Sequence, residues 1–451
     1  MAHPSTRLDF EPPIHAAVLS ATDTPPSPGH LDAVRQSLAP ADTFDVVDTA
    51  ALQPGAGFDV VFVARACGPT PVADVVCRAG LPALCIDPHR GYHPYHAAFY
   101  HDLKRGGGMP LPANLPDTIE QSIRAVRRRL AIRGTKLIVA DPGTDESRNE
   151  QIRRFTAACQ ERLGVEILVR TTDELKARAS DIGDAAADAE LKRWYADLLE
   201  GPGAMDVAHM LQVARLYLAQ RAMLEEAGAA GITPYDIKGF LLVDPPEVMP
   251  NVSYGPLVSD GYLVCEEADI EALTTELLLY AGLGTHPTMS NIYFLFRDQF
   301  GKLATHEEYT NEMELADTRQ CFEDNHVTIS HFSTSGILPP DMMEETRYTV
   351  RETLPAWPGQ SMIAATPKLG PVAMARLDDD AAGIHLDYGE ADGLGFGDHL
   401  GWYRGRWFVR LPDAGDFAGR CLHQHYVIAR DSGEHEVLET LLHTLLGITR
   451  L

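Results

Sequence analysis

Short, uninterrupted runs of apolar residues alternate with longer helical segments through the first half of the chain, and this alternation constrains the fold most. The runs IHAAVLSA (14–21), DVVFVARAC (59–67) and TKLIVAD (135–141) have the length and the Val, Ile and Ala content of buried strands. Helical segments such as 30–39 and 147–164 stand between such runs. Strands that are apolar along their whole length occur in parallel sheets that are covered on both faces. The first half therefore predicts doubly wound α/β units of the Rossmann or flavodoxin type.

With 451 residues, the chain is too long for one ordinary hydrophobic core and suits two or three domains. We expect one α/β domain at 1–133 and a second at 134–253, which can share elements with the C-terminal part of the chain. After about Tyr254, short strand-like runs are separated by Gly, Pro and Asp, a pattern typical of an antiparallel sheet or barrel. The predicted fold class is α/β, with two doubly wound parallel-sheet domains and a β-rich, antiparallel barrel-like domain over 254–451.

The charge of the chain narrows the classes of partner. There are 38 Lys and Arg residues against 64 Asp and Glu residues, a formal net charge of −26. Such a field repels phosphate backbones and anionic membrane surfaces, so we expect no nucleic-acid and no membrane partner. Neutral sugars and metal cations fit the charge better.

The seven cysteines are scattered and form no CxxC pair, which argues against a disulfide framework and a zinc ribbon. The N-terminal stretch MAHPSTRLDFEPP has no apolar core of a secretory signal, and no apolar run approaches the roughly 20 residues that span a bilayer. We therefore expect a cytoplasmic protein.

Several familiar catalytic motifs are missing from the sequence. The glycines Gly106–Gly108 stand in a basic loop and fit no dinucleotide-binding fingerprint. The sequence contains no GxSxG elbow and no HExxH helix. Kinase, serine-hydrolase and zincin activities are therefore not predicted.

Polar residues inside apolar C-terminal segments are the remaining candidates for chemistry. Glu266 follows an apolar strand at the start of a helix, and His331 interrupts the strand-like run VTISHFS. His423 and His425 are two residues apart, so on a strand both rings point to one face, as in many metal sites. One carboxylate and several imidazoles indicate a divalent metal site. The alternatives are a helix-start acid that favours the helix dipole and ordinary hydrogen-bonded histidines.

An ordered set of segments resembles the L-arabinose isomerase and L-fucose isomerase superfamily, in particular its shorter, divergent members. The resemblance covers most of the chain and is strongest after Thr135. The segments that carry it are VCEEADIEALTTELLL (264–279), FEDNHVTISHFSTSG (322–336), GPVAMARL (370–377) and HQHYVIARDSGEHEVLETLLHTLLGI (423–448), with ARLYLAQRAMLEEAG and ITPYDIKG upstream.

The resemblance implies a set of metal ligands and a cofactor. Glu266 matches the first metal carboxylate, which in the family also acts as an acid–base group. His331 matches the middle imidazole ligand and His425 the C-terminal one, with His423 as the fallback ligand or a substrate-binding residue. The cofactor implied is Mn²⁺ or another divalent cation such as Co²⁺ or Mg²⁺.

Asn291 departs from the family pattern, because it stands where the resemblance places a second metal-binding carboxylate. An Asn can bind a cation through its carbonyl oxygen, but it cannot accept a proton as a carboxylate does. Isomerisation in the family is attributed to a metal-bound ene-diol, with a carboxylate that moves the proton between adjacent carbons. Either Glu266 or Glu267 works alone, a carboxylate from 300–324 substitutes, or the reaction has changed.

The resemblance makes a metal-dependent aldose–ketose isomerase that acts on a small sugar or sugar derivative the leading prediction. The same fold and metal site with an epimerase or lyase reaction is one alternative, and a non-catalytic sugar-binding or regulatory protein is another. Family members share active sites between subunits, which implies a homo-oligomer, a trimer or hexamer. His93 and His96 lie in an N-terminal segment that would line a sugar pocket across such an interface, or would form an ordinary surface loop.

Overall fold

The structure is a computed structural model whose described residues form two compact units. It describes residues 8, 10–66, 71–86, 94–112, 116–195, 207–235, 251–293, 296–297, 303–304, 325–330, 338, 342–344, 349–353, 361–364, 367–399, 402–421, 423 and 425–451. The first unit contains Asp9–Arg133 and Gly433–Thr449. The second contains Gly134–Ser432 and the chain ends Met1–Leu8 and Arg450–Leu451. The division of the chain into three domains stays a prediction from the sequence.

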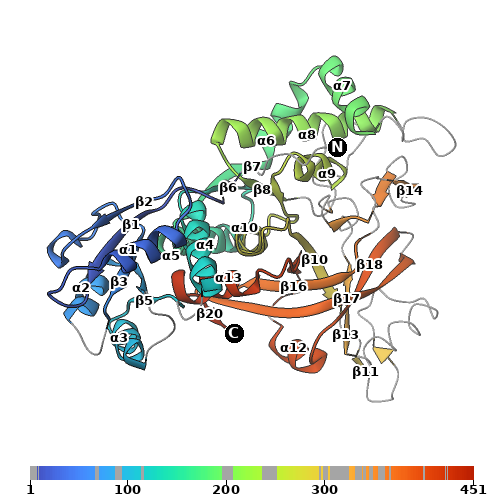
Figure 1. Ribbon diagram of the computed structural model, residues 1–451. Helices are drawn as coiled ribbons and strands as arrows, with labels where there is room; N and C mark the ends of the chain where they lie inside the picture. The colour runs from blue at the N-terminus through green and yellow to red at the C-terminus, as the bar shows by residue number, and fades with distance from the viewer. Residues whose placement is uncertain are drawn as a thin grey trace. The chain divides into compact units, whose positions relative to one another are not determined.

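The first unit is built on a parallel sheet with the strand order β2-β1-β3-β4-β5 (Figure 1). Strands β3 and β4 are buried along their whole length, as their unbroken apolar sequences predict. The C-terminal helical segments α13 and η4 pack against α4. The strands are β1 (His15–Ser20), β2 (Thr43–Val46), β3 (Val60–Ala64), β4 (Pro82–Ile86) and β5 (Met109–Pro110). The helices are α1 (Pro28–Ser37), η1 (Thr49–Ala51), α2 (Pro71–Ala79), α3 (Pro94–Arg105), α4 (Pro116–Ile132), α13 (His435–Glu439) and η4 (Thr440–Leu445).

The second unit contains another parallel sheet, with the strand order β7-β6-β8-β9. Helix α8 packs against α6, α7 and α9 in one hydrophobic core, to which it contributes Met210, Val213 and Tyr217. The strands are β6 (Lys136–Asp141), β7 (Glu166–Thr171), β8 (Gly231–Pro234) and β9 (Leu263–Val264). The helices are α5 (Glu146–Arg162), α6 (Thr172–Ser180), α7 (Asp184–Tyr195), α8 (Val207–Ala227), α9 (Asn251–Ser259) and α10 (Ile270–Leu283). None of the described helices has the length and hydropathy needed to cross a membrane.

A seven-stranded antiparallel sheet completes the second unit, in the order β16-β19-β10-β13-β18-β17-β20. The long strand β17 pairs with β16 along its first part and with β18 along its second, so that the sheet curls into a half-barrel. Its strands are β10 (Thr288–Tyr293), β13 (His326–Ser330), β16 (Gly370–Leu377), β17 (Gly383–His399), β18 (Trp402–Arg410), β19 (His425–Arg430) and β20 (Thr449–Arg450). The second unit also contains helix α12 (Ala414–Arg420) and two small two-stranded sheets. One pairs β11 (Phe296–Arg297) with β12 (Leu303–Ala304), and the other pairs β14 (Thr349–Thr353) with β15 (Ser361–Ala364).

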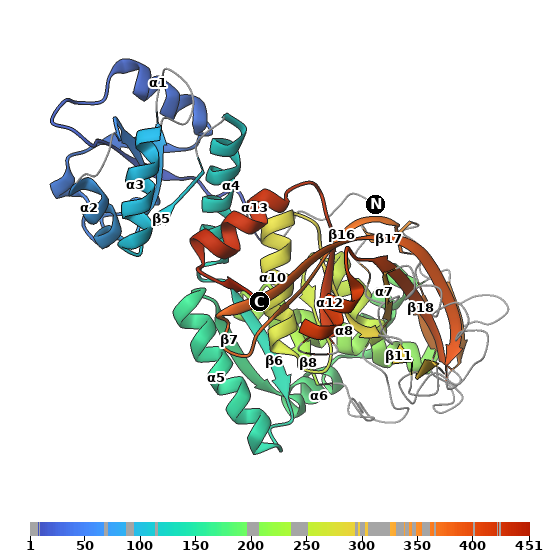
Figure 2. The same cartoon turned by 90° about the horizontal axis from the view of Figure 1, so that it is seen from below.

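Helix α10 connects the parallel and antiparallel sheets of the second unit. It contacts β6, β8 and β9 on one side and β10, β16 and β19 on the other (Figures 1 and 2). All of its residues are buried, as expected of a helix that is apolar around most of its circumference. The mixed α/β architecture with parallel sheets and a curled antiparallel sheet is the layout that the sequence predicts.

Gly231 is needed where β8 meets β9. A Cβ atom at this position would lie 2.7 Å from the carbonyl oxygen and 2.8 Å from the Cβ atom of Leu263. We expect Gly231→Ala to lower the free energy of unfolding by about 1–3 kcal/mol, the usual cost of overpacking a core. Urea unfolding measures this loss. Gly419→Ala is the matched control, because no atom lies within 4 Å of its added Cβ. Equal stability of the two variants would contradict this packing.

Candidate metal centre

The site begins at a strained turn between β9 and α10. Glu267 (φ 60°) and Ala268 (φ 49°) are consecutive non-glycine residues in the left-handed region, a conformation that costs about 1–3 kcal/mol per residue. The Ala268 amide donates to the Pro234 carbonyl (3.0 Å), and the Asp269 amide donates to the Glu266 carbonyl (3.1 Å). The turn is therefore held by its neighbours rather than by local preference.

Arg148 of α5 braces the same turn. Its Nη2 donates to the carbonyl oxygens of Glu267 (2.5 Å) and Ala268 (3.1 Å). Its Nε donates to Oδ2 of the buried Asp141 (2.5 Å), and its guanidinium lies over the Tyr235 ring. Arg148 thus fixes the backbone that carries the acidic residues of the site.

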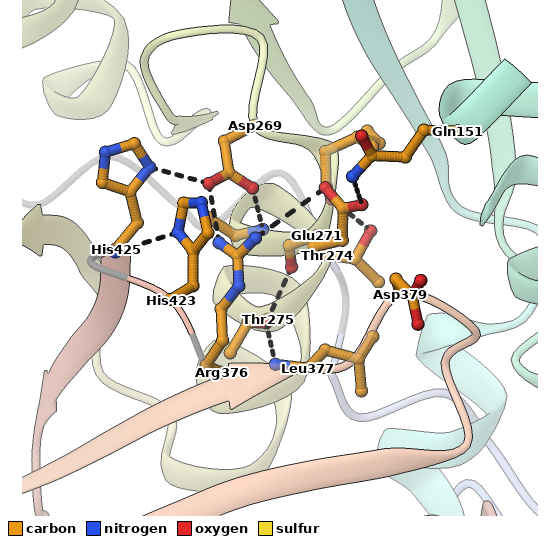
Figure 3. Close-up of polar contacts among 12 residues, drawn as sticks. Gln151, Asp269, Glu271, Thr274, Thr275, Arg376, Leu377, Asp379, His423 and His425 are labelled. Carbon is orange, nitrogen blue, oxygen red and sulfur yellow. Dashed lines mark hydrogen bonds and ion pairs between the residues drawn. The ribbon is translucent and has the colours of Figure 1, made fainter. Parts of the chain in front are cut away.

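Asp269 is the N-cap residue of α10 and the centre of a buried network. Its Oδ1 accepts the Ala272 amide (2.8 Å). Its Oδ2 accepts Nη1 of Arg376 (2.7 Å) and Nδ1 of His425 (2.8 Å) (Figure 3). Burial alone would raise the pKa of Asp269, but the Arg376 charge and then His425 hold it well below its usual value. The carboxylate is therefore ionised at neutral pH.

Arg376, a buried residue of β16, also lies near a second carboxylate. Its Nη2 is 3.9 Å from Oε2 of Glu271, whose Oε1 accepts Nε2 of Gln151 (2.9 Å) (Figure 3). Burial and then the charge of Asp269 raise the pKa of Glu271. Two neighbouring carboxyl groups thus have pKa values displaced in opposite directions.

The two histidines approach Asp269 at the start of β19, which begins at His425. The His423 and His425 ring centroids are 4.8 Å apart, and the His425 amide donates to Nδ1 of His423 (3.0 Å). His423 is exposed overall, but desolvation of its ring and then the Arg376 charge lower its pKa to about 4. Nε2 of His425 lies 3.4 Å from Oε2 of Glu267.

These groups surround a cavity of about 190 Å³. Ligand atoms of Asp269, His423 and His425 lie within 4.8 Å of one another and form a candidate divalent-metal triad. One carboxylate and two imidazoles form a mixed O/N donor set, which fits first-row divalent metals. The cavity is lined by Arg148, Gln151, Ile152, Glu267, Ala268, Asp269, Ile270, Glu271, Arg376, His423 and His425.

The residues predicted from the sequence are only partly brought together. His423 and His425 meet at the cavity, and Asn291 of β10 pairs directly with His425. Glu266 is buried in the strained turn, where its carbonyl accepts the Thr233 hydroxyl (3.1 Å). The metal-binding and catalytic roles of these residues stay predictions.

His331 and His93 lie outside the described residues. His96 is buried in α3 of the first unit.

Sequence reasoning missed Asp269, Arg376 and Arg148. Asp269 immediately precedes an apolar helical run, which is the signature of an N-cap residue. Arg376 is an isolated charge in the apolar strand GPVAMARL, and a buried charge requires a partner. These two signals are readable in the sequence, whereas the role of Arg148 depends on a turn conformation that has no such signal.

Comparisons with known proteins identify no family. No protein-family model and no curated protein matches the chain. Among solved structures, a carbohydrate transporter from Acidothermus cellulolyticus 11B in complex with myo-inositol matches with 13% identity, over 72% of this chain and 100% of that chain. Its TM-score is 0.15, too low to support an argument about fold or function.

Removing the charge of Arg376 should strongly destabilise the second unit. Arg376→Gln leaves Asp269 and Glu271 without their buried cation, a change that typically costs about 3–5 kcal/mol. The control is Arg154→Gln, which breaks an exposed pair with Asp379 and should cost less than about 1 kcal/mol. Urea unfolding at pH 7 compares the two variants. Equal losses would show that Arg376 does not hold the network together.

Glu271→Gln should stabilise the protein in a pH-dependent way. Because the folded-state pKa of Glu271 is raised above 4.5, its ionisation favours the unfolded state as the pH rises. We expect the variant to unfold at a higher temperature than the parent at pH 7–8 and at the same temperature near pH 4. A difference that is independent of pH would contradict this assignment.

Proposed function

We propose that the chain is a metal-dependent aldose–ketose isomerase that acts on a small sugar or sugar derivative. The observation that carries the proposal is the convergence of ligand atoms of Asp269, His423 and His425 within 4.8 Å of one another in the lining of a polar cavity. The polar lining supplies several hydrogen-bonding groups that can distinguish hydroxyl positions. The segments that resemble the arabinose and fucose isomerase superfamily also support this function.

The metal ion would be held in this cluster, by ligands drawn from the triad and the adjacent Glu267. When bound, a divalent ion polarises neighbouring carbonyl and hydroxyl oxygens of a substrate as a Lewis acid. The mixed donor set suits Mn²⁺ or Co²⁺ better than Mg²⁺, which prefers oxygen ligands.

The proton transfer needs a side chain that takes a proton from one carbon and returns it to the next. Asp269 is engaged with the helix end, Arg376 and His425. Glu267 and Glu271 are the other carboxyl groups of the cavity lining, and we assign the transfer to one of them. Gln151 would orient Glu271 through their hydrogen bond.

We also propose a homo-oligomer with shared active sites, a trimer or hexamer, on the strength of the family resemblance. A cytoplasmic location is proposed as well. It is supported by the described cysteines Cys77, Cys85, Cys159, Cys265 and Cys421, none of which is in a disulfide.

A second candidate keeps the fold and the metal but has an epimerase or lyase reaction. The position of Asn291 favours it, because this residue pairs with His425 where the resemblance places a carboxylate. An amide at this point removes one acid–base group from the neighbourhood of the ion.

Sugar conversion in the presence of Mn²⁺ tests the proposal. Purified protein incubated with pentoses, hexoses and deoxysugars should convert at least one aldose to its ketose, as followed by ¹H NMR. His425→Gln should reduce the rate by about 100-fold or more, because Lewis-acid polarisation supplies several kcal/mol of barrier lowering. His435→Gln, a change at an exposed residue of α13, is the control.

Tight metal binding without ketose from any aldose would remove the isomerase proposal. Gain of isomerase activity only in Asn291→Asp would favour the second candidate.

A further inference from the structure

We propose that the metal ion bonds directly to Nε2 of His425 and to the carboxylate of Glu267. Asp269 and His423 then position His425 without bonding to the ion. The inference rests on the proposed function only in taking the ion to be a divalent metal.

The hydrogen bond between His425 and Asp269 determines which ring nitrogen can bind a metal. Nδ1 lies 2.8 Å from Oδ2 of Asp269, the same oxygen that accepts Nη1 of Arg376, so Nδ1 donates to this oxygen and carries the proton. In a neutral imidazole the lone pair is then on Nε2. This is the nitrogen that lies opposite Glu267.

The distance between the two proposed ligand atoms matches one shared ion. Nε2 of His425 and Oε2 of Glu267 are 3.4 Å apart. Ligand atoms about 2.1 Å from one ion lie about 3.4 Å apart at a tetrahedral angle and about 3.0 Å apart at an octahedral right angle. Little movement would therefore be needed to admit a cation between them.

Asp269 is poorly placed to be a direct ligand. Its oxygens already accept the Ala272 amide, Arg376 and His425, so a metal bond would compete with the helix cap or with a buried ion pair. Metal-binding histidines commonly donate their second N–H to a carboxylate, which fixes the ring. Asp269 has the geometry of this outer partner.

Neither ring nitrogen of His423 offers an available lone pair for a metal. Its Nδ1 accepts the backbone amide of His425, and the proton of the neutral ring is then on Nε2. The contact instead links His423 to the backbone that positions His425.

The turn conformation explains why Glu267 rather than Glu266 faces His425. The left-handed pair at 267–268 turns the Glu267 side chain to the cavity, where it is 23% exposed, whereas Glu266 is 2% exposed. Arg148 holds the Glu267 carbonyl in this arrangement. A metal entering the cavity can therefore reach the Glu267 carboxylate.

Titration of each variant with Mn²⁺ alone tests the assignment. Glu267→Gln and His425→Gln should weaken binding by more than the about 10- to 100-fold typical of losing an outer partner. His423→Gln should weaken it by no more than that range, and Glu266→Gln should leave the affinity within a few-fold of the parent. Thermal melting verifies that each variant is folded.

Pulsed electron paramagnetic resonance of the Mn²⁺-loaded parent gives a second readout that needs no variant. One directly bound imidazole nitrogen is expected, and the signal should persist in His423→Gln and disappear in His425→Gln. Two bound imidazoles, parent-like affinity in Glu267→Gln, or greater loss in Glu266→Gln would overturn the assignment. A parent that binds no Mn²⁺ would overturn it too, whereas the expected pattern without sugar conversion would remove only the proposed function.

Discussion

The carboxylate of Asp269 is the contact on which the rest of the site depends. One oxygen caps α10, and the other accepts hydrogen bonds from Arg376 of β16 and His425 of β19. Three elements that are far apart in the sequence therefore meet at one ionised group. Because the group is buried, each partner is needed to offset the loss of hydration, and the geometry of the cluster is narrowly defined.

The position of α10 explains why such a group is required. A helix buried between two sheets cannot expose its first amide groups to water, so a side chain must accept at least one of them. The same carboxylate brings a negative charge to the helix N-terminus, which the helix dipole favours. The strained residues Glu267 and Ala268 immediately before the cap are tolerated because Arg148 and Pro234 bind their backbone. The turn and cap that support the start of α10 therefore also form part of the lining of the polar cavity.

The fold and the candidate site differ in how far the sequence predicts them. The unbroken apolar strands predict the parallel sheets, because burial on both faces leaves a local pattern. The later strands, which are separated by turn residues, predict the antiparallel sheet. The spacing of His423 and His425 predicts neighbouring rings on one strand; the ring centroids are 4.8 Å apart, but β19 begins only at His425. In CEEAD, by contrast, three carboxylates are close in sequence, and their directions depend on a turn that is stabilised by an arginine more than a hundred residues away. The pairing of Asp269 with Arg376 is also long-range, and no local period reveals it.

Anomalous diffraction from crystals soaked in Mn²⁺ would test most directly whether these side chains form a metal centre. We predict one strong peak in the cavity, about 2.1–2.3 Å from Nε2 of His425, with Glu267 as its nearest carboxylate and the hydrogen bond between Asp269 and His425 intact. A cavity without a peak, or a peak bonded to Asp269 in place of Arg376, would contradict the proposed metal centre.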